Sequence, residues 1–135
     1  MNIQEILQDL NDLFSVFDDP KDKFIQLMDM AKESGQLVDA EKIDTNKIYG
    51  CTSQAWVVAS PNKDGTYTFR ADSDALIVKG LLTLLEKIFN NQPVTEILSI
   101  TSNEVLTSVG LDGAVTSQRT NGFSSAVDKI QELVK

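Results

Sequence analysis

The chain has 135 residues, 41% of them hydrophobic, with a net charge of −8, one cysteine and no histidine. Its length predicts a single domain over residues 1–135, and its negative charge argues against a nucleic-acid partner. Without histidine there can be no His-based zinc site, Ser-His-Asp triad or Cys-His pair, and a lone cysteine excludes an internal disulfide.

The first half of the chain predicts two helices, an irregular segment and a hairpin. Apolar residues recur at helical spacing over 3–16, and Asp19-Pro20 is typical of the start of a second helix, which we expect to end at Gly35. Residues 36–50 are rich in polar and turn-forming types. Residues 55–60 and 66–71 predict two strands joined by a turn, and a weaker pattern around 47–49 suggests a third.

The second half predicts four helices. Asp72 or Ser73 is expected to cap the first, with Asp74 at its positive end and an apolar body over 75–89. Paired carboxylates could also serve acid–base or metal chemistry, but capping is the favoured interpretation. Pro93 and the capping box at 101–104 predict two short helices.

Gly110 is expected to end the second of these short helices, and residues 123–134 predict a last one. The fold class is therefore α+β, with a small antiparallel sheet of about three strands packed against several helices. No N-terminal targeting segment and no apolar run of about 18 residues is evident, so we expect a cytoplasmic protein without a membrane span.

Acidic residues are concentrated in the first third of the chain. Residues 1–45 contain 11 Asp and Glu against 4 Lys, whereas residues 46–135 contain 9 acids against 8 bases. The favoured interpretation is a solvated surface. The alternative is a docking surface for a basic patch on a partner.

Cys51 is the residue best suited to chemistry. It follows Gly50 and precedes the polar run Thr52-Ser53-Gln54, a context typical of a loop between strands. A buried structural cysteine is the alternative. A reactive thiolate here could attack a partner's persulfide by the in-line displacement known from thiol–disulfide exchange. With no histidine as base, backbone N–H groups or a cation must favour the thiolate, and Arg119 is the best candidate cation.

Three blocks of sequence resemble the SufE family of sulfur acceptors in Fe–S metabolism. Residues 49–56, Tyr-Gly-Cys-Thr-Ser-Gln-Ala-Trp, resemble its G-C-x-S-Q-V-W signature, with Ala55 in place of Val. Residues 71–81 resemble its D-S-D-A-x-I-V-K-G-L block. Residues 119–123 resemble its R-x-N-G-L/F block, although Ser117-Gln118 replaces the family's Pro-Ser. An early Asp22-Lys23-Phe24 also matches.

The resemblance implies a SufE/IscU-like α+β fold and a role in sulfur transfer. Cys51 matches the family's persulfide-carrying cysteine, and Gly50, Ser53, Gln54, Asp74 and Arg119 match loop and partner-facing positions. It implies a pyridoxal-phosphate-dependent cysteine desulfurase of the SufS type as partner and a SufBCD-like scaffold as recipient. No cofactor or metal is expected in this chain, which would act as an accessory protein rather than a stand-alone enzyme.

Competing functions remain open at this stage. The main alternative is a non-catalytic adapter that regulates a desulfurase, including one of the CsdA type, without carrying sulfur. An Fe–S scaffold is disfavoured because one cysteine and no histidine supply too few soft ligands. For a carrier, we expect Cys51 to lie beneath its loop at rest and to swing out on docking.

Overall fold

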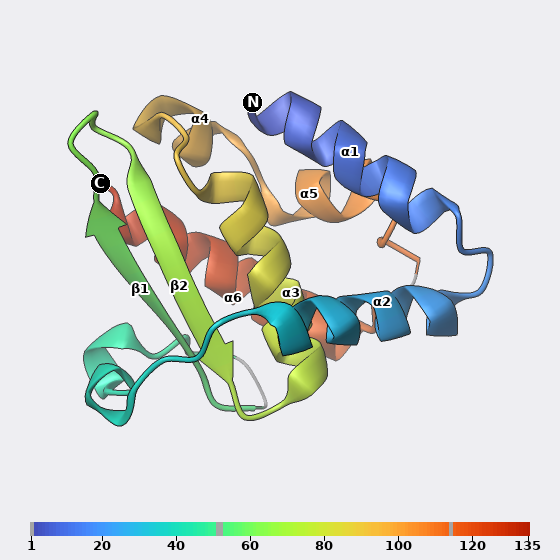
Figure 1. Ribbon diagram of the computed structural model, residues 1–135, viewed down its shortest axis with the longest axis horizontal. Helices are drawn as coiled ribbons and strands as arrows, with labels where there is room; N and C mark the ends of the chain where they lie inside the picture. Colours follow the sequence, from blue (N-terminus) through green and yellow to red (C-terminus); the bar gives the residue numbers. More distant parts are fainter. Residues whose placement is uncertain (1, 51–52, 114) are drawn as a thin grey trace.

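The computed structural model describes residues 2–50, 53–113 and 115–135 (Figure 1). The elements in these ranges are α1 (Ile3–Ser15), α2 (Pro20–Glu33), β1 (Ala55–Pro61), β2 (Tyr67–Ser73), α3 (Leu76–Phe89), α4 (Val94–Ser99), α5 (Ser102–Ser108) and α6 (Ser117–Leu133). Two short 3-10 turns, η1 (Asp39–Glu41) and η2 (Asp44–Asn46), lie between α2 and β1. The predicted α+β class is confirmed.

Local capping sets where the first two helices begin. The Asn2 side chain accepts a hydrogen bond from the Glu5 N–H at 2.9 Å, and the Glu5 carboxylate bonds back to the Asn2 N–H. Asp19 accepts from the Lys21 N–H at 2.9 Å with Pro20 in the first helical position, as predicted. Helix α2 ends at Glu33, so Gly35 lies beyond the helix and does not close it.

The sheet is smaller than the sequence suggested. Strands β1 and β2 pair antiparallel, with a register that runs from Ala55 opposite Ser73 to Pro61 opposite Tyr67. The third strand expected near residues 47–49 is reduced to an isolated bridge between Lys47 and Trp56. The preceding residues form η1 and η2 instead, and these turns leave little extended backbone to pair.

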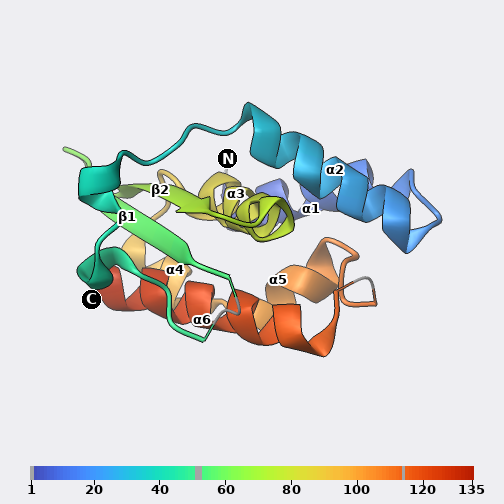
Figure 2. The ribbon, with the colours of Figure 1, turned by 90° about the horizontal axis from the view of Figure 1, so that it is seen from below.

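Helix α3 lies at the centre of the molecule. Figure 2 shows α3 and the hairpin between α2 on one side and α6 on the other, with α4 and α5 beside α6. Leu84, Leu85, Ile88 and Phe89 of α3 are completely buried, which agrees with the apolar character of this segment on most sides. The predicted central helix is therefore confirmed.

Helix α5 follows its predicted signals at both ends, whereas α6 begins earlier than predicted. Thr101 caps α5 by accepting from the Glu104 N–H at 3.1 Å, and Gly110, with φ of +79°, follows that helix. Helix α6 begins at Ser117, about two turns earlier than the apolar pattern indicated, because Thr116 supplies a polar N-cap. The polar stretch that contains Arg119 is thus helical.

None of the helices in the described part of the chain is long and apolar enough to cross a bilayer.

Gly80 lets α3 approach α2 closely. A Cβ at this position would lie 2.8 Å from the carbonyl carbon of Leu27 and nearer still to its oxygen. Both atoms belong to helical backbone, which cannot move aside as a side chain can. The glycine in Lys79-Gly80-Leu81 is therefore required by packing between two helices.

We predict that Gly80→Ala lowers the free energy of unfolding by about 3 kcal/mol, the upper part of the range for overpacking, because backbone must shift. Urea unfolding followed by circular dichroism measures the change. Gly35→Ala is the matched control, since a Cβ there meets nothing within 4 Å and stability should stay within about 1 kcal/mol of wild type. Equal stabilities for the two variants would contradict the packing argument.

Candidate functional site

The candidate site is described by the residues on either side of Cys51, the cysteine that the sequence singles out. Cys51 and Thr52 lie outside the described residues, and so does the expectation that the thiol rests beneath its loop. Gly50 precedes these two residues, and the half-buried Ser53 and exposed Gln54 follow them. The contacts of these neighbours define where the Cys51 segment begins and ends.

The entry to the Cys51 segment lies against α6. Gly50 has φ of +95°, a left-handed conformation that favours glycine, and a Cβ there would lie 2.5 Å from the Ser125 hydroxyl oxygen. That hydroxyl donates to the Asn121 carbonyl in the preceding turn of α6, at 3.1 Å. Gly50 therefore meets two requirements at once: a turn in the backbone and close contact with a helix.

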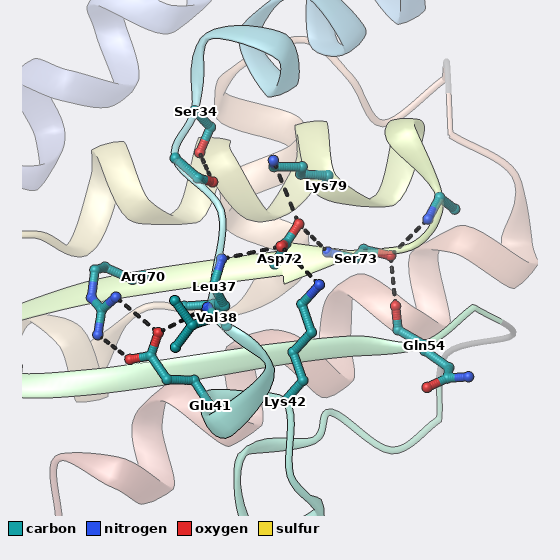
Figure 3. A network of polar contacts seen from close by, with 12 residues as sticks. Ser34, Leu37, Val38, Glu41, Lys42, Gln54, Arg70, Asp72, Ser73 and Lys79 are labelled. Carbon is teal, nitrogen blue, oxygen red and sulfur yellow. Dashed lines mark hydrogen bonds and ion pairs between the residues drawn. The ribbon is translucent and has the colours of Figure 1, made fainter.

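The exit of the segment is bound to the junction of β2 and α3. The Gln54 N–H donates to the Asp74 carboxylate at 3.1 Å, and the Asp74 N–H donates to the Gln54 carbonyl at 3.2 Å. The Ser73 hydroxyl donates to the same carbonyl at 2.7 Å (Figure 3). Three hydrogen bonds thus hold Gln54, which lies three residues after Cys51.

A buried carboxylate lies directly behind this junction. Asp72 is 4% exposed and accepts hydrogen bonds from the N–H groups of Leu37, at 3.1 Å, and Ser73, at 2.9 Å. The ammonium groups of Lys79 and Lys42 each lie 3.5 Å from one of its oxygens (Figure 3). Lys79 is itself buried, with 7% of its surface exposed.

The surroundings of Asp72 keep it ionised. Burial alone raises the pKa of this carboxyl, but the two backbone donors and the two ammonium groups outweigh burial and hold the pKa of Asp72 below its usual value. A permanently charged group of this kind suits a structural role and not general acid catalysis. Among the residues that the structure describes, no three metal-binding side chains form a cluster around it.

These contacts correct the prediction that Asp72 or Ser73 caps the following helix. Helix α3 begins at Leu76 with Ala75 at the N-cap and no side-chain cap, although the Ser73 hydroxyl accepts from the Ala75 N–H at 3.2 Å. Asp74 binds the Gln54 backbone in place of the helix end. The sequence could not separate these outcomes, because a cap and a partner from a distant loop require the same oxygen atoms.

Arg119 lies in the first turn of α6. Its guanidinium carbon is 5.8 Å from the centre of the Phe24 ring in α2, a cation–π contact between two helices. Gly50 contacts Ser125, which is six residues further along α6. The structure thus brings Gln54 and Asp74 together, and it places Gly50 against the same helix that carries Arg119.

Sequence reasoning missed several residues that support the site. The sequence indicates Lys79 only as part of a motif, and no pattern marks Lys42 or Leu37. Lys23 and Phe24 of the early motif also have partners, since the Lys23 ammonium donates to the Gly110 carbonyl at 2.9 Å and Phe24 contacts Arg119. A lysine inside an otherwise apolar helix, as at position 79, was the one available signal for a buried ion pair.

Comparison with known proteins gives consistent matches over the whole chain. The model of the SufE family, described as an Fe-S metabolism associated domain, matches residues 8–134. An uncharacterized SufE-like protein of Rhizobium etli is 32% identical over 132 residues, which cover 96% of this chain and 89% of that protein. A SufE-like protein of Synechocystis is 35% identical over 113 residues, or 84% of this chain and 70% of that protein.

Two further matches are a relative that is much longer than this chain and a solved structure. SufE-like protein 1 of Arabidopsis thaliana, named as chloroplastic/mitochondrial, is 36% identical over 126 residues. These cover 93% of this chain but only 34% of the plant protein, so the chain spans about a third of that relative. The solution structure of a hypothetical protein from Thermus thermophilus has a TM-score of 0.77 at 18% identity, covering 96% of this chain and 93% of that one. It supports the fold.

We predict that Asp72→Asn lowers the free energy of unfolding by about 3–5 kcal/mol at neutral pH, because it leaves the buried Lys79 beside a neutral side chain. The pKa of Asp72 is lowered on folding, so its contribution is full above the ordinary value of 3.8 and is lost as pH falls through the folded pKa. The difference from wild type should therefore shrink below about pH 4.

Urea unfolding at several pH values tests this sign. Asp29→Asn is the matched control, because it breaks an exposed ion pair with Lys32 and should change stability by no more than about 1 kcal/mol. A difference that grows as pH falls would contradict the assignment of Asp72 as an ionised anchor.

We predict that Asp74→Ala increases amide hydrogen exchange at Gln54 by about fivefold, as expected for the loss of one hydrogen bond. Asp74→Asn keeps a side-chain oxygen to accept from the Gln54 N–H and should exchange like wild type. Exchange measured by mass spectrometry on a peptide that contains Gln54 distinguishes the two variants. Equal exchange in the alanine variant and wild type would mean that this hydrogen bond does not hold the exit.

Proposed function

The chain belongs to the SufE family of proteins associated with Fe–S metabolism, and on that premise we propose that it carries sulfur on Cys51. The sulfur comes from the persulfide of a pyridoxal-phosphate-dependent cysteine desulfurase of the SufS type. The desulfurase holds the cofactor and carries out the cleavage of cysteine. This chain contributes the acceptor thiol and speeds turnover by emptying the desulfurase for its next cycle.

The transfer step balances without any added oxidant or reductant. The Cys51 thiolate attacks the terminal sulfur of the partner's persulfide, and a new sulfur–sulfur bond forms on Cys51. The sulfur–sulfur bond on the partner breaks, and the partner's cysteine leaves as a thiolate. A second attack, by a thiol of the recipient, moves the sulfur on. We propose a SufBCD-like Fe–S scaffold as that recipient.

The single cysteine is the observation that supports this function most directly. Cys51 is the only thiol in the sequence, so no resolving cysteine within the chain can discharge its persulfide as sulfide. A free thiol also suits a reducing compartment, and we propose the cytoplasm. The junction around Gln54 and the contact of Gly50 with α6 hold both flanks of the cysteine, as presentation to a partner requires.

Arg119 is our proposed cation for the thiolate or the docked partner. The chain has no histidine to act as base, so a guanidinium is a suitable source of positive charge. Arg119 and the residue that contacts Gly50 both belong to α6, so one helix carries the proposed cation and the entry to the Cys51 segment. Its contact with Phe24 also ties this end of α6 to α2.

The competing function is an adapter that activates a desulfurase, including one of the CsdA type, without carrying sulfur. It needs the same docking surface but no thiol. The two functions therefore differ in whether they need the sulfur atom of Cys51.

We predict that Cys51→Ser abolishes stimulation of a SufS-type desulfurase while leaving the fold intact. Sulfide release from cysteine under reducing conditions measures stimulation, and circular dichroism checks the fold. Ser60→Ala, which removes one exposed hydroxyl near the far end of β1, is the matched control and should retain stimulation within about twofold. Full stimulation by Cys51→Ser would reject the carrier function and favour the adapter.

A further inference from the structure

We propose that Asp72 and Lys79 form a positioning pair for Cys51. Their buried ion pair fixes the approach to the cysteine segment and its exit in one arrangement. The inference rests on the proposed function for its meaning, but its geometry concerns this chain alone. Neither residue is argued to touch the transferred sulfur.

The exit is linked to Asp72 through Ser73. One oxygen of the Asp72 carboxylate accepts from the Ser73 N–H at 2.9 Å, which fixes the end of β2. The Ser73 hydroxyl donates to the Gln54 carbonyl at 2.7 Å. The path from the buried carboxylate to Gln54 therefore consists of one residue and two hydrogen bonds (Figure 3).

The approach to the cysteine segment, residues 37–42, is bound to the other oxygen of the same carboxylate. That oxygen accepts from the Leu37 N–H at 3.1 Å and lies 3.5 Å from the Lys42 ammonium, which also lies 5.4 Å from the centre of the Trp56 ring in β1. The Arg70–Glu41 ion pair on the neighbouring surface ties the same segment to β2. Residues 37–42 are thereby held against the hairpin before the chain turns toward Gly50.

Lys79 fixes the carboxylate itself. Its ammonium lies 3.5 Å from the oxygen that accepts from Ser73, and 9% of its side chain is exposed. Lys42 is more exposed, at 31% of its side chain, so solvent weakens its interaction with Asp72 more strongly. We therefore assign the stronger electrostatic interaction with Asp72 to Lys79. Lys42 attaches residues 37–42 to the same carboxylate.

The pair matters for transfer because displacement at sulfur requires alignment. The attacking thiolate, the terminal sulfur and the leaving sulfur must lie in line, and a small misplacement of the attacking atom costs rate steeply. Docking brings the partner's persulfide to a fixed place, so the position of Cys51 depends on its two flanks. Asp72 binds the exit of the segment through Ser73 and residues 37–42 through Leu37 and Lys42, so we infer that loosening this carboxylate slows transfer.

Lys79→Met tests the pair, because it removes the charge and keeps an unbranched apolar side chain. Two readouts are used: hydrogen exchange of the peptide around residues 50–56 in the free chain, and single-turnover transfer from a persulfide-charged SufS-type desulfurase over a range of chain concentrations. We expect exchange to increase about fivefold. The limiting transfer rate should fall about tenfold, while the half-saturating concentration stays within about twofold, because alignment is lost and docking is not.

Val105→Ala controls for a general loss of stability. Val105 is completely buried in α5, away from the Asp72 network, so its truncation weakens the core without touching either flank. It should leave both readouts unchanged. If Lys79→Met does not fold, Lys42→Met takes its place, with smaller changes in the same direction.

Three outcomes decide between the explanations. Wild-type exchange and a wild-type limiting rate in a folded Lys79→Met variant would overturn the positioning pair, and so would equal effects in Val105→Ala. Failure of the wild-type chain to accept sulfur would reject the proposed function instead. In that case the exchange readout, which needs no partner, still tests whether Lys79 holds the flanks of Cys51.

Discussion

The structure depends on a carboxylate that is removed from water and fully compensated. Asp72 is 4% exposed, and two backbone N–H groups and two lysines surround it. A buried ion pair of this kind adds little net stability compared with apolar packing, but breaking it by removing one partner is costly. Its value lies in specificity, because the charge is satisfied only when three separate segments meet: the 37–42 segment, the end of β2 and the first turn of α3.

The same motif residues connect the small sheet, helix α3 and the end of the Cys51 segment at Gln54. Lys79 follows Asp72 by seven residues and returns to it from α3, and its neighbour Gly80 lets α2 pack closely against that helix. Between Asp72 and Lys79, Ser73 and Asp74 bind Gln54. One short block of sequence therefore contains the buried anchor, the helix contact and the bonds to the cysteine loop. This chain belongs to the SufE family, and the function that we propose for the block is to position the residues next to Cys51.

Sequence reasoning succeeded where the signal was local. The starts of α1, α2, α4 and α5 and the hairpin followed from caps, prolines and apolar spacing. It failed where a distant segment competes for the same atoms. The sequence predicts a helix cap at Asp72, but in the fold its carboxylate binds Leu37 and Lys42. The third strand was lost to the turns η1 and η2, and the early start of α6 had no apolar residues to reveal it. The contacts of Gly50 and Gln54 beside Cys51 are of this distant kind, and no pattern along the chain encodes them.

Direct observation of sulfur on the cysteine tests the central claim most directly. A desulfurase is charged with cysteine labelled with radioactive sulfur, freed of unreacted cysteine, mixed with this chain and analysed without reducing agent. The account predicts that label leaves the desulfurase and appears on this chain, that Cys51 gains about 32 Da for one sulfur atom, and that a thiol reductant removes it. Label that stays on the desulfurase while its turnover still increases would contradict the account.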